Sequence, residues 1–330
     1  SIPPREKIRE NAAIELPHVM LLVDDPIDRQ KIDGCQGATQ EDAVNIAAVK
    51  HGIIEYVYAI RDTLRKLYDT ELMQGGGHIR GYAVEGEAAK QVTEAFAAKQ
   101  NSCGGFLFAV GDGNHSLATA KTCWENIKKI GKFTEEQLKN HPARHALVEI
   151  CNLHSEALEF KPIHRLLTNV DVKDILSFFE AEITKQGLAS TEGDEIVFEY
   201  VESGSCDSAK PANGNEVVSE NNDGSCTAPI KNSGINITNR GDRLPVEILQ
   251  GILDKYLETH GNVEIDYIHG DEALHGLVKE TKGCGIFLQS IDKSTLFPAI
   301  NAGGVLPRKT FSIGEANEKR YYMECHKISM

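Results

Sequence analysis

The residues best suited to chemistry lie together in the stretch GDGNHS, residues 111–116. The apolar segment FLFAV ends directly before it, and the helical pattern LATAKTCWENIKKIG begins directly after it. Such a strand-turn-helix exposes the first backbone N–H groups of a helix, which together with the helix dipole favour a phosphate or carboxylate. Gly111 and Gly113 allow the backbone to approach the anion closely. The alternative is a plain turn in which Asn114 or Ser116 caps the helix.

Asp112 and His115 are the candidate catalytic residues of this turn. A carboxylate can bind a metal ion or orient an acceptor, and an imidazole can contact phosphate or move a proton. Lys121 lies five residues beyond Ser116 and would neutralise a bound anion if it faces the turn. The stretch contains neither the P-loop pattern GxxxxGK[ST] nor the Rossmann pattern GxGxxG.

Two other clusters carry cations that suit an anionic ligand. His164 and Arg165 stand in the stretch FKPIHRLL, where they would supply a titratable group and a two-pronged phosphate donor. Arg308 and Lys309 follow a pair of glycines on a predicted loop. In both places a solvated pair of charges is the structural alternative.

The elements that must position these residues are helices and strands without strict alternation. This pattern predicts an α+β fold with mixed sheets and packed helices. The periodicity predicts helices over residues 40–67 (with Gly52 as a candidate break), 85–100, 117–131, 142–154 (helical or mixed), 172–185 and 245–260. It predicts strands over 17–23, 78–84, 106–110, 263–270 and 284–291.

A change of composition suggests how the chain is divided. Residues 203–239 are poor in large apolar side chains and rich in Gly, Ser, Asn and Asp, so they cannot offset their ordering entropy by burial. We expect a portion with the GDGNHS turn over residues 1–190, a variable and partly flexible insertion over 191–240, and a C-terminal α+β portion over 241–330. The chain begins with Ser1, from which we expect an N-terminal segment to be missing.

Charge and hydropathy exclude two classes of protein. The 330 residues contain 35 Lys and Arg against 49 Asp and Glu, a net charge of −14. A nucleic-acid binder needs clustered Lys and Arg to release counterions from phosphates, so we expect no nucleic-acid partner. No apolar run approaches the ~18–20 residues of a membrane span, so we expect no membrane association.

The cysteines and histidines indicate a reducing compartment and no zinc site. The eight cysteines are scattered and form no CxxC pair, which is typical of reduced thiols in the cytoplasm. The alternative is a pairing of Cys206 with Cys226. His141 and His145 have the spacing of ligands on one helical face, but Pro142 between them places His141 before the helix and not on it.

At GDGNHSLATAK the chain resembles the bacterial domain-of-unknown-function family 1015, particularly its clostridial-type branch. The resemblance continues through IPPREKIRENAAIELPHVMLLVDDP, LYDTELMQGGGHIRGYAV, HPARHALVEICNLHSEALEFKPIHRLL, DYIHG and GVLPRKTFSIGEANEKRYYMEC. The segment from about 203 to 239 has no counterpart in it. The family's DGHHR-like motif, here residues 112–116, is similar to the nucleotide-binding motif of the ParB/sulfiredoxin superfamily, which includes ADP-dependent free-serine kinases.

This resemblance implies a ParB/sulfiredoxin-like nucleotide-binding core that takes ADP or ATP, or CTP, together with Mg²⁺ carried by the nucleotide. Asp112 would be the residue to meet that ion. The family's genes often lie beside serine-biosynthesis genes, which implies serine or phosphoserine as the small molecule. Ser116 replaces an Arg of the wider pattern, so Lys121, Arg165 or Arg308 would have to supply the cation. The kinases take their carboxylate base from a segment ahead of the motif, and we assign no base here.

Three functions remain open from the sequence. The first is a nucleotide-dependent phosphotransferase acting on a small metabolite. In it, residues 111–116 hold phosphate, and Asp112 and His115 act on the reacting groups. The remaining cations stabilise charge: Lys121, His164, Arg165, Arg308 and Lys309. The second is a non-catalytic nucleotide or metabolite sensor. The third is a metal-dependent phosphatase in serine metabolism. Nothing in the sequence indicates the oligomeric state.

Overall fold

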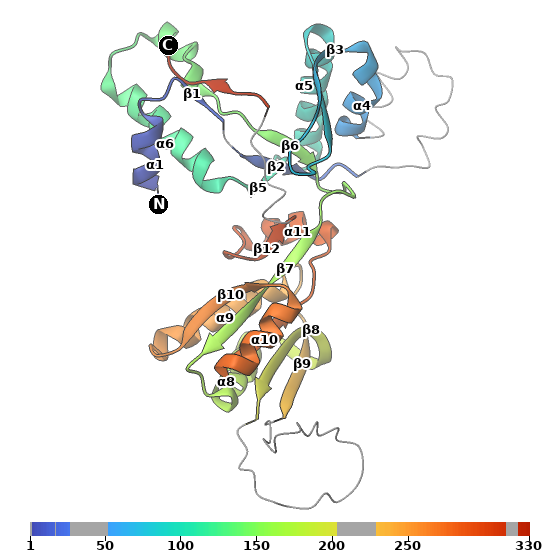
Figure 1. Cartoon of the computed structure of the whole chain (residues 1–330), viewed down its shortest axis with the longest axis vertical. Coiled ribbons are helices and arrows are strands. Elements are labelled where there is room, and N and C mark those ends of the chain that lie inside the picture. Colours follow the sequence, from blue (N-terminus) through green and yellow to red (C-terminus); the bar gives the residue numbers. More distant parts are fainter. Residues whose placement is uncertain (1, 17, 27–51, 203–228, 315–322) are drawn as a thin grey trace, which may run out of the picture. The chain divides into compact units, whose positions relative to one another are not determined.

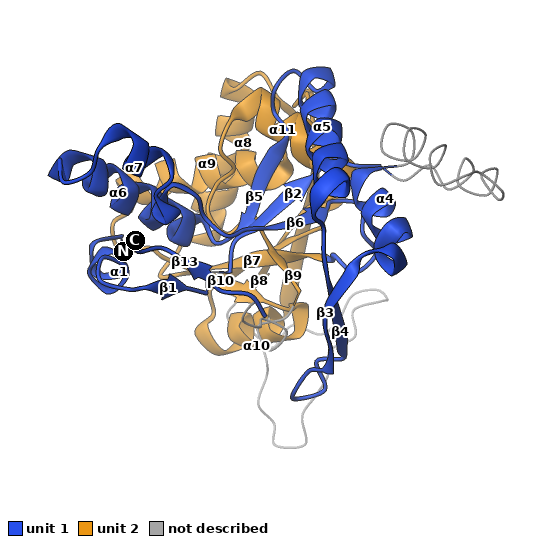
Figure 2. Cartoon of the chain, turned by 90° about the horizontal axis from the view of Figure 1, so that it is seen from above, with its two compact units in different colours: residues 1–159, 315–330 blue, residues 160–314 orange. Residues whose placement is uncertain are grey.

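The computed structural model describes residues 2–16, 18–26, 52–202, 229–314 and 323–330. The chain forms two compact units: Ser1–Glu159 with Glu315–Met330 make unit 1, and Phe160–Gly314 make unit 2 (Figure 2). Helices and sheets occur in both units, so the expected α+β class is confirmed. Among the described residues, every helix is too short or too polar to cross a lipid bilayer.

A three-stranded sheet with the order β5-β2-β6 organises unit 1 (Figure 1). The central strand β2 (Met20–Val23) is the apolar segment MLLV, whose last two residues, Leu22 and Val23, are buried. β5 (Phe108–Asp112) runs antiparallel to β2, and β6 (Glu149–Asn152) runs parallel to it. The end of β5 therefore lies beside the start of β2, whereas β2 and β6 end together at the opposite edge.

Helices and two small pairs of strands complete unit 1. α6 (Asn114–Ile130) packs against α1 (Ile2–Arg9), and β1 (Ile14–Glu15) pairs with β13 (His326–Lys327). The other elements are α4 (Ile53–Ile60), η2 (Arg61–Thr63), the hairpin of β3 (Arg65–Glu71) and β4 (His78–Ala83), α5 (Gly86–Ser102), α7 (Glu135–Lys139) and η3 (Pro142–Arg144). In Figure 1, α4, α5 and the hairpin lie together on the side of β6.

Unit 2 is built on one antiparallel sheet with the order β10-β7-β11-β8-β9, and β12 also pairs with β7. Its strands are β7 (Phe160–Thr168), β8 (Ala189–Val201), β9 (Ile230–Thr238), β10 (Glu264–His269), β11 (Cys284–Leu288) and β12 (Phe311–Ile313). Its helices are α8 (Val172–Lys185), α9 (Pro245–Thr259), α10 (Asp271–Thr281) and α11 (Lys293–Gly303).

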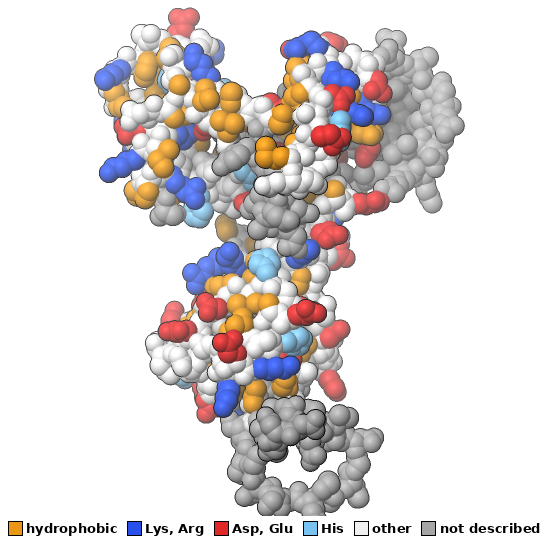
Figure 3. Space-filling model, viewed as in Figure 1, with side chains coloured by type: hydrophobic (Ala, Val, Ile, Leu, Met, Phe, Trp, Pro, Cys, Tyr) orange, Lys and Arg blue, Asp and Glu red, His pale blue; other side chains and the backbone are white. Residues whose placement is uncertain are grey.

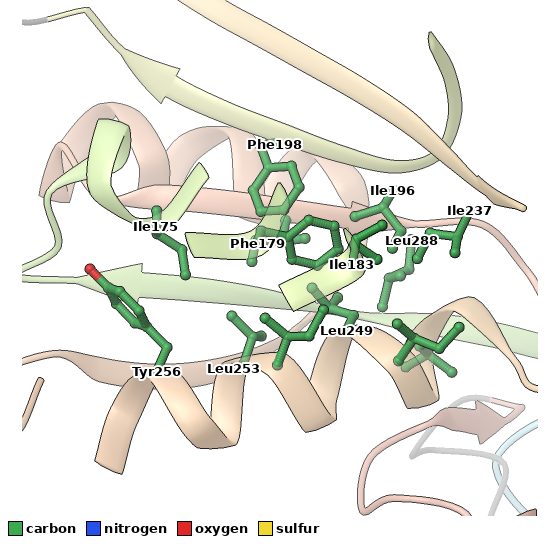
Figure 4. Packing of buried hydrophobic residues seen from close by; sticks show 14 of the residues in the cluster. Ile175, Phe179, Ile183, Ile196, Phe198, Ile237, Leu249, Leu253, Tyr256 and Leu288 are labelled. Atoms are coloured by element: carbon green, nitrogen blue, oxygen red, sulfur yellow. The ribbon is translucent and has the colours of Figure 1, made fainter. Parts of the chain in front are cut away.

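The main core of unit 2 lies between this sheet and the helices α8 and α9. In Figure 4, Phe179 of α8 lies beside Phe198 of β8, and Leu253 of α9 belongs to the same cluster. The rings of Phe179 and Phe198 meet edge to face with centroids 5.3 Å apart, the geometry that aromatic quadrupoles favour. A smaller core faces α10, where Leu166 of β7 meets two apolar residues of that helix. Successive residues of β7 therefore enter different cores.

The structure differs from several sequence predictions. The helix expected over residues 40–67 is the shorter α4, followed by a strand, and its first residues lie outside the described part of the chain. Asp25 decides where α4 begins, because its carboxylate accepts the N–H of Ile53 (2.6 Å) and of Ile54 (3.3 Å). The stretch 142–154 is a 3₁₀ turn followed by β6, since pairing with β2 outweighs its local helical pattern.

The division of the chain also differs from the expected one. The boundary between the units falls after residue 159, and the position 190 expected for it lies inside β8. The expected insertion over 191–240 contains most of β8 and all of β9, which pair along their length. The residues between them, 203–228, including Cys206 and Cys226, lie outside the described residues. The five cysteines that the structure describes are free thiols.

Candidate functional site

The GDGNHS stretch, expected as a turn between a strand and a helix, contains one connecting residue. Gly111 and Asp112 are the last residues of β5, Gly113 lies between the two elements, and Asn114 begins α6. Gly113 is the N-cap of α6 in the left-handed conformation (φ 85°), and as a glycine it has no side chain that could cap the helix. A Cβ at Gly113 would overlap the carbonyl oxygen of His18 and stand 2.7 Å from Cα of Val19. Both are backbone atoms that cannot move aside, so glycine is required for its φ and for the close approach of two chain segments.

Asp112 is held at the end of β5 by two neighbours. One carboxylate oxygen accepts the N–H of Gly113 at 2.7 Å, and the other lies 3.5 Å from Nδ1 of His18. The Asp112 side chain is 35% exposed and that of His18 is 29% exposed, so both can reach a ligand. The turn thus combines a helix N-terminus, a carboxylate and an imidazole.

The other residues of the motif fall into two positions. Asn114 and His115 are exposed in the first turn of α6, and Ser116 is half-buried beside them. Lys121 is also exposed, but it begins about 10 Å further along the helix, at 1.5 Å rise per residue. Lys121 therefore stands two turns away from the anion site for which it was proposed.

His164 and Arg165 are buried in unit 2 and point in opposite directions. Neighbouring residues of a strand face opposite sides of the sheet, and both side chains follow this rule. His164 is 1% exposed and pairs with Asp271 of α10 (2.7 Å), whereas Arg165 is fully buried and bonds Gln250 of α9. The two residues therefore cannot grip one ligand together.

The guanidinium of Arg165 donates its hydrogen bonds to groups of the protein itself. Its Nε and one terminal nitrogen each donate to Oε1 of Gln250 at 3.2 Å, and its other donors meet the carbonyls of Ile163 and Lys309. Its guanidinium lies 5.0 Å from the ring centre of Tyr267, and burial lowers its pKa to about 10. This is the environment of a structural cation that anchors the 306–310 loop.

Arg308 and Lys309 are exposed on that loop. Arg308 stands 5.7 Å from the ring centre of Tyr267, within reach of a cation–π interaction. Lys309 has a left-handed backbone (φ 59°), and its carbonyl is the one that Arg165 holds. These residues and the β7 pair belong to unit 2, whereas residues 111–121 belong to unit 1.

The sheet of unit 1 assembles two carboxylate–imidazole pairs that no sequence motif indicates. His18 meets Asp112 because β2 and β5 are antiparallel neighbours. Asp24 and His154 meet at 2.6 Å because the parallel strands β2 and β6 end side by side. The members of each pair lie about 90 to 130 residues apart in sequence, so only strand pairing reveals them. In the described part of the chain no cluster of three or more His, Cys, Asp or Glu could hold a metal ion.

Buried neutral histidines make stability depend on pH. Burial lowers the pKa of His141 and of His164 below the ordinary 6.5, so the unfolded chain binds more protons below that pH. We expect the free energy of unfolding to fall as the pH drops from about 6.5, by at most about 1.4 kcal/mol per pH unit for each histidine. Urea titrations between pH 7.5 and 5.5 measure this fall.

The matched variant is His141→Asn. His141 accepts the N–H of Ala143 at 3.1 Å, and asparagine offers an acceptor without the titration. The variant should show a flatter dependence on pH than the parent. An equal slope in both would show that His141 does not contribute.

Acidic and basic side chains are intermingled on the face of the described residues drawn in Figure 3. The fold and the site define an α+β protein in which a half-buried strand leads through one glycine into the N-terminus of a helix. The sequence matches the family described as "Protein of unknown function (DUF1015)" over residues 1–221, so the chain belongs to that family.

Solved structures similar to the chain include a conserved hypothetical protein from Pyrococcus furiosus, with 14% identity and a TM-score of 0.36 over 64% of this chain and 71% of that one. Free serine kinase in complex with AMP has 11% identity and a TM-score of 0.37 over 92% and 90% of the two chains. A mutant of free serine kinase in complex with ADP has 11% identity and a TM-score of 0.35 over 91% and 90%. No curated protein matches the chain.

Proposed function

We propose that the chain binds a nucleotide by its phosphates at the GDGNHS turn and transfers a phosphoryl group to or from a small metabolite, with serine or phosphoserine as first choice. The observation that carries this proposal is the N-terminus of α6, which begins at Gly113, a residue without a capping side chain, beside the carboxylate of Asp112. The first N–H groups of a helix have no partner within it, and they suit phosphate oxygens.

Asp112 acquires a defined role in this proposal. A bare carboxylate beside a phosphate repels it, so a cation must stand between them or Asp112 must face the acceptor instead. Mg²⁺ is commonly held by one or two carboxylates plus the phosphates of its nucleotide, which a single half-exposed Asp112 fits. The ion would offset phosphate charge, while Asp112 holds it or orients the acceptor hydroxyl.

His18 and His115 are the groups proposed to handle protons and phosphate at the turn. His18 faces Asp112 at 3.5 Å, and exposed His115 stands at the second position of α6. In phosphoryl transfer the protein mainly positions groups and neutralises charge, so these contacts suit the task.

The free thiols of the described residues support a cytoplasmic setting for this activity.

Substitution of Ser116 tests the site without disturbing the fold. Ser116→Asp places a carboxylate in the first turn of α6, where it favours the helix by about 0.3–1 kcal/mol but repels a phosphate. We expect unchanged or raised thermal stability together with at least a tenfold loss of affinity for ADP, ATP or CTP. Isothermal titration with and without Mg²⁺ measures the affinity, and Ser116→Asn is the neutral control.

Two results would overturn the proposal. One is the absence of binding of any of the three nucleotides to the parent chain. The other is equal binding by the aspartate and asparagine variants.

A nucleotide sensor without turnover is the second candidate. The observation that favours it is the position of Lys121, two turns beyond the phosphate site. Ser116 stands where the family usually has an Arg, and Lys121 is too far along the helix to replace that cation. Without a fixed cation the charge of a transferring phosphoryl group is poorly stabilised. Formation of phosphoserine from serine and ADP or ATP, lost in Asp112→Ala, would decide for the enzyme. Phosphate release from phosphoserine without nucleotide would indicate a phosphatase.

A further inference from the structure

Unit 1 contains a pocket of about 760 Å³ that the proposed phosphate site does not use. It is formed by α4, α5, the β3–β4 hairpin and β6, which lie together in Figure 1. The GDGNHS turn follows β5, which is separated from β6 by β2. Volumes of about 300–1,000 Å³ are typical of small-molecule sites.

Three elements supply most of the apolar wall of this pocket. Ile54 and Val57 extend from α4, Val92 and Phe96 from α5, and Ile150 from β6. All five are half-buried, whereas core residues of the same unit such as Leu22 and Ile53 are 1–2% exposed. Apolar surface left open on several converging elements is surface that a ligand can cover.

The charged side chains among the described lining residues all have one sign. They are Arg61, His78 and Arg80, and no Asp or Glu of the described residues lines the pocket, although the whole chain carries 14 more acidic than basic residues. Two phenols, Tyr58 and Tyr82, are the other polar side chains of this described lining. A wall with this composition favours an anionic group on an apolar body.

The cations are positioned by contacts behind the wall. Arg61 lies 4.0 Å from the ring centre of Tyr58 and donates to that residue's carbonyl at 2.7 Å. Arg80 directs Nε to Asp69 at 3.3 Å, and His78 contacts Asp69 and Glu71. These carboxylates fix the hairpin cations but do not line the pocket.

We propose that this pocket is a second ligand site, which binds an organic anion with an aromatic or acyl body independently of the nucleotide at the GDGNHS turn. The apolar walls would hold the body, and Arg61 and Arg80 would hold the anionic group. The proposal goes beyond phosphate binding and does not depend on it.

Two fluorescent probes with the same body test the inference. 1-Anilinonaphthalene-8-sulfonate carries the anion, and N-phenyl-1-naphthylamine lacks it. We expect saturable binding of one sulfonate per chain, with affinity at least tenfold higher than for the neutral amine. Arg61→Gln and Arg80→Gln should each weaken sulfonate binding roughly 3- to 10-fold, as for a half-exposed ion pair, and leave the amine unaffected.

Controls separate the pocket from other sources of fluorescence. Arg65→Gln removes an exposed cation of the same hairpin outside the pocket and should change neither affinity. Val92→Trp fills the pocket and should abolish binding of both probes, with cooperative unfolding by circular dichroism confirming that the variant is folded. Equal sulfonate binding by the parent and both arginine variants would overturn the inference.

Competition with nucleotide tests the second site separately from the proposed function. ADP should not displace the sulfonate, and Ser116→Asp should bind it as the parent does. Displacement by ADP would refute an independent second site while leaving nucleotide binding intact. A parent chain that binds the sulfonate but no nucleotide would refute the proposed function and leave the second-site inference intact.

Discussion

Arg165→Met is expected to lower the free energy of unfolding of unit 2 by about 3 kcal/mol. The substitution leaves three acceptors without donors: Oε1 of Gln250 and the carbonyl of Ile163, which are buried, and the carbonyl of Lys309, which is partly buried. A buried acceptor left unpaired costs about 1–3 kcal/mol, since water cannot replace the lost donor. Removing the guanidinium also removes the cost of burying its charge, which offsets part of the loss. We therefore expect a value near the lower end of the summed cost of the three unpaired acceptors.

A double variant separates these two effects. Gln250→Leu removes the acceptor that takes two of the hydrogen bonds, so Arg165→Met with Gln250→Leu should recover part of the loss, a coupling that a double-mutant cycle measures. Arg308→Met is the matched control, because this exposed cation should change stability by no more than about 0.5 kcal/mol. Urea unfolding followed by circular dichroism suits unit 2, since the sole tryptophan, Trp124, lies in unit 1.

Nucleotide titrations of the same variants decide between two roles for Arg165. If Arg165 is a structural cation, Arg165→Met should bind nucleotide as the parent does at temperatures at which the variant is folded. Unchanged stability with loss of nucleotide binding would reverse this assignment and restore the phosphate-binding role predicted from sequence.

Gly113→Ala is expected to abolish nucleotide binding and to destabilise unit 1 by about 3 kcal/mol or more. The left-handed conformation alone costs an alanine about 1–2 kcal/mol. The added Cβ also overlaps the backbone of His18 and Val19, so β2 and the turn must separate. That separation moves Asp112 away from His18 and tilts the first N–H groups of α6.

Gly131→Ala is the control at the other end of the same helix. Gly131 also has a positive φ (69°), but its Cβ would meet no atom within 4 Å. We expect a loss of about 1 kcal/mol and unchanged nucleotide affinity. Thermal unfolding followed by Trp124 fluorescence, with isothermal titration below the transition, measures both properties. Equal losses in the two variants would mean that the close approach to His18 is unimportant.

The sequence by itself determined the features that depend on a few consecutive residues. FLFAV followed by GDGNHS and a helical repeat becomes β5, a turn at Gly113 and α6, because an apolar run, a glycine that tolerates positive φ and helix formers act locally. The same holds for α8, where Asp171 accepts the N–H of Lys173 and of Asp174 at the N-terminus. The α+β class follows from the same local signals.

Only the tertiary structure decided what adjacent or distant residues do together. His164 and Arg165 look like a functional pair in sequence, but a strand directs them to opposite faces, where Asp271 and Gln250 hold them separately. Conversely, the pairing of β2 with β5 and β6 brings Asp112 to His18 and Asp24 to His154. The pocket beside β6 arises in the same way from four elements. Such contacts depend on strand pairing and helix packing across long stretches of chain, which no local pattern specifies.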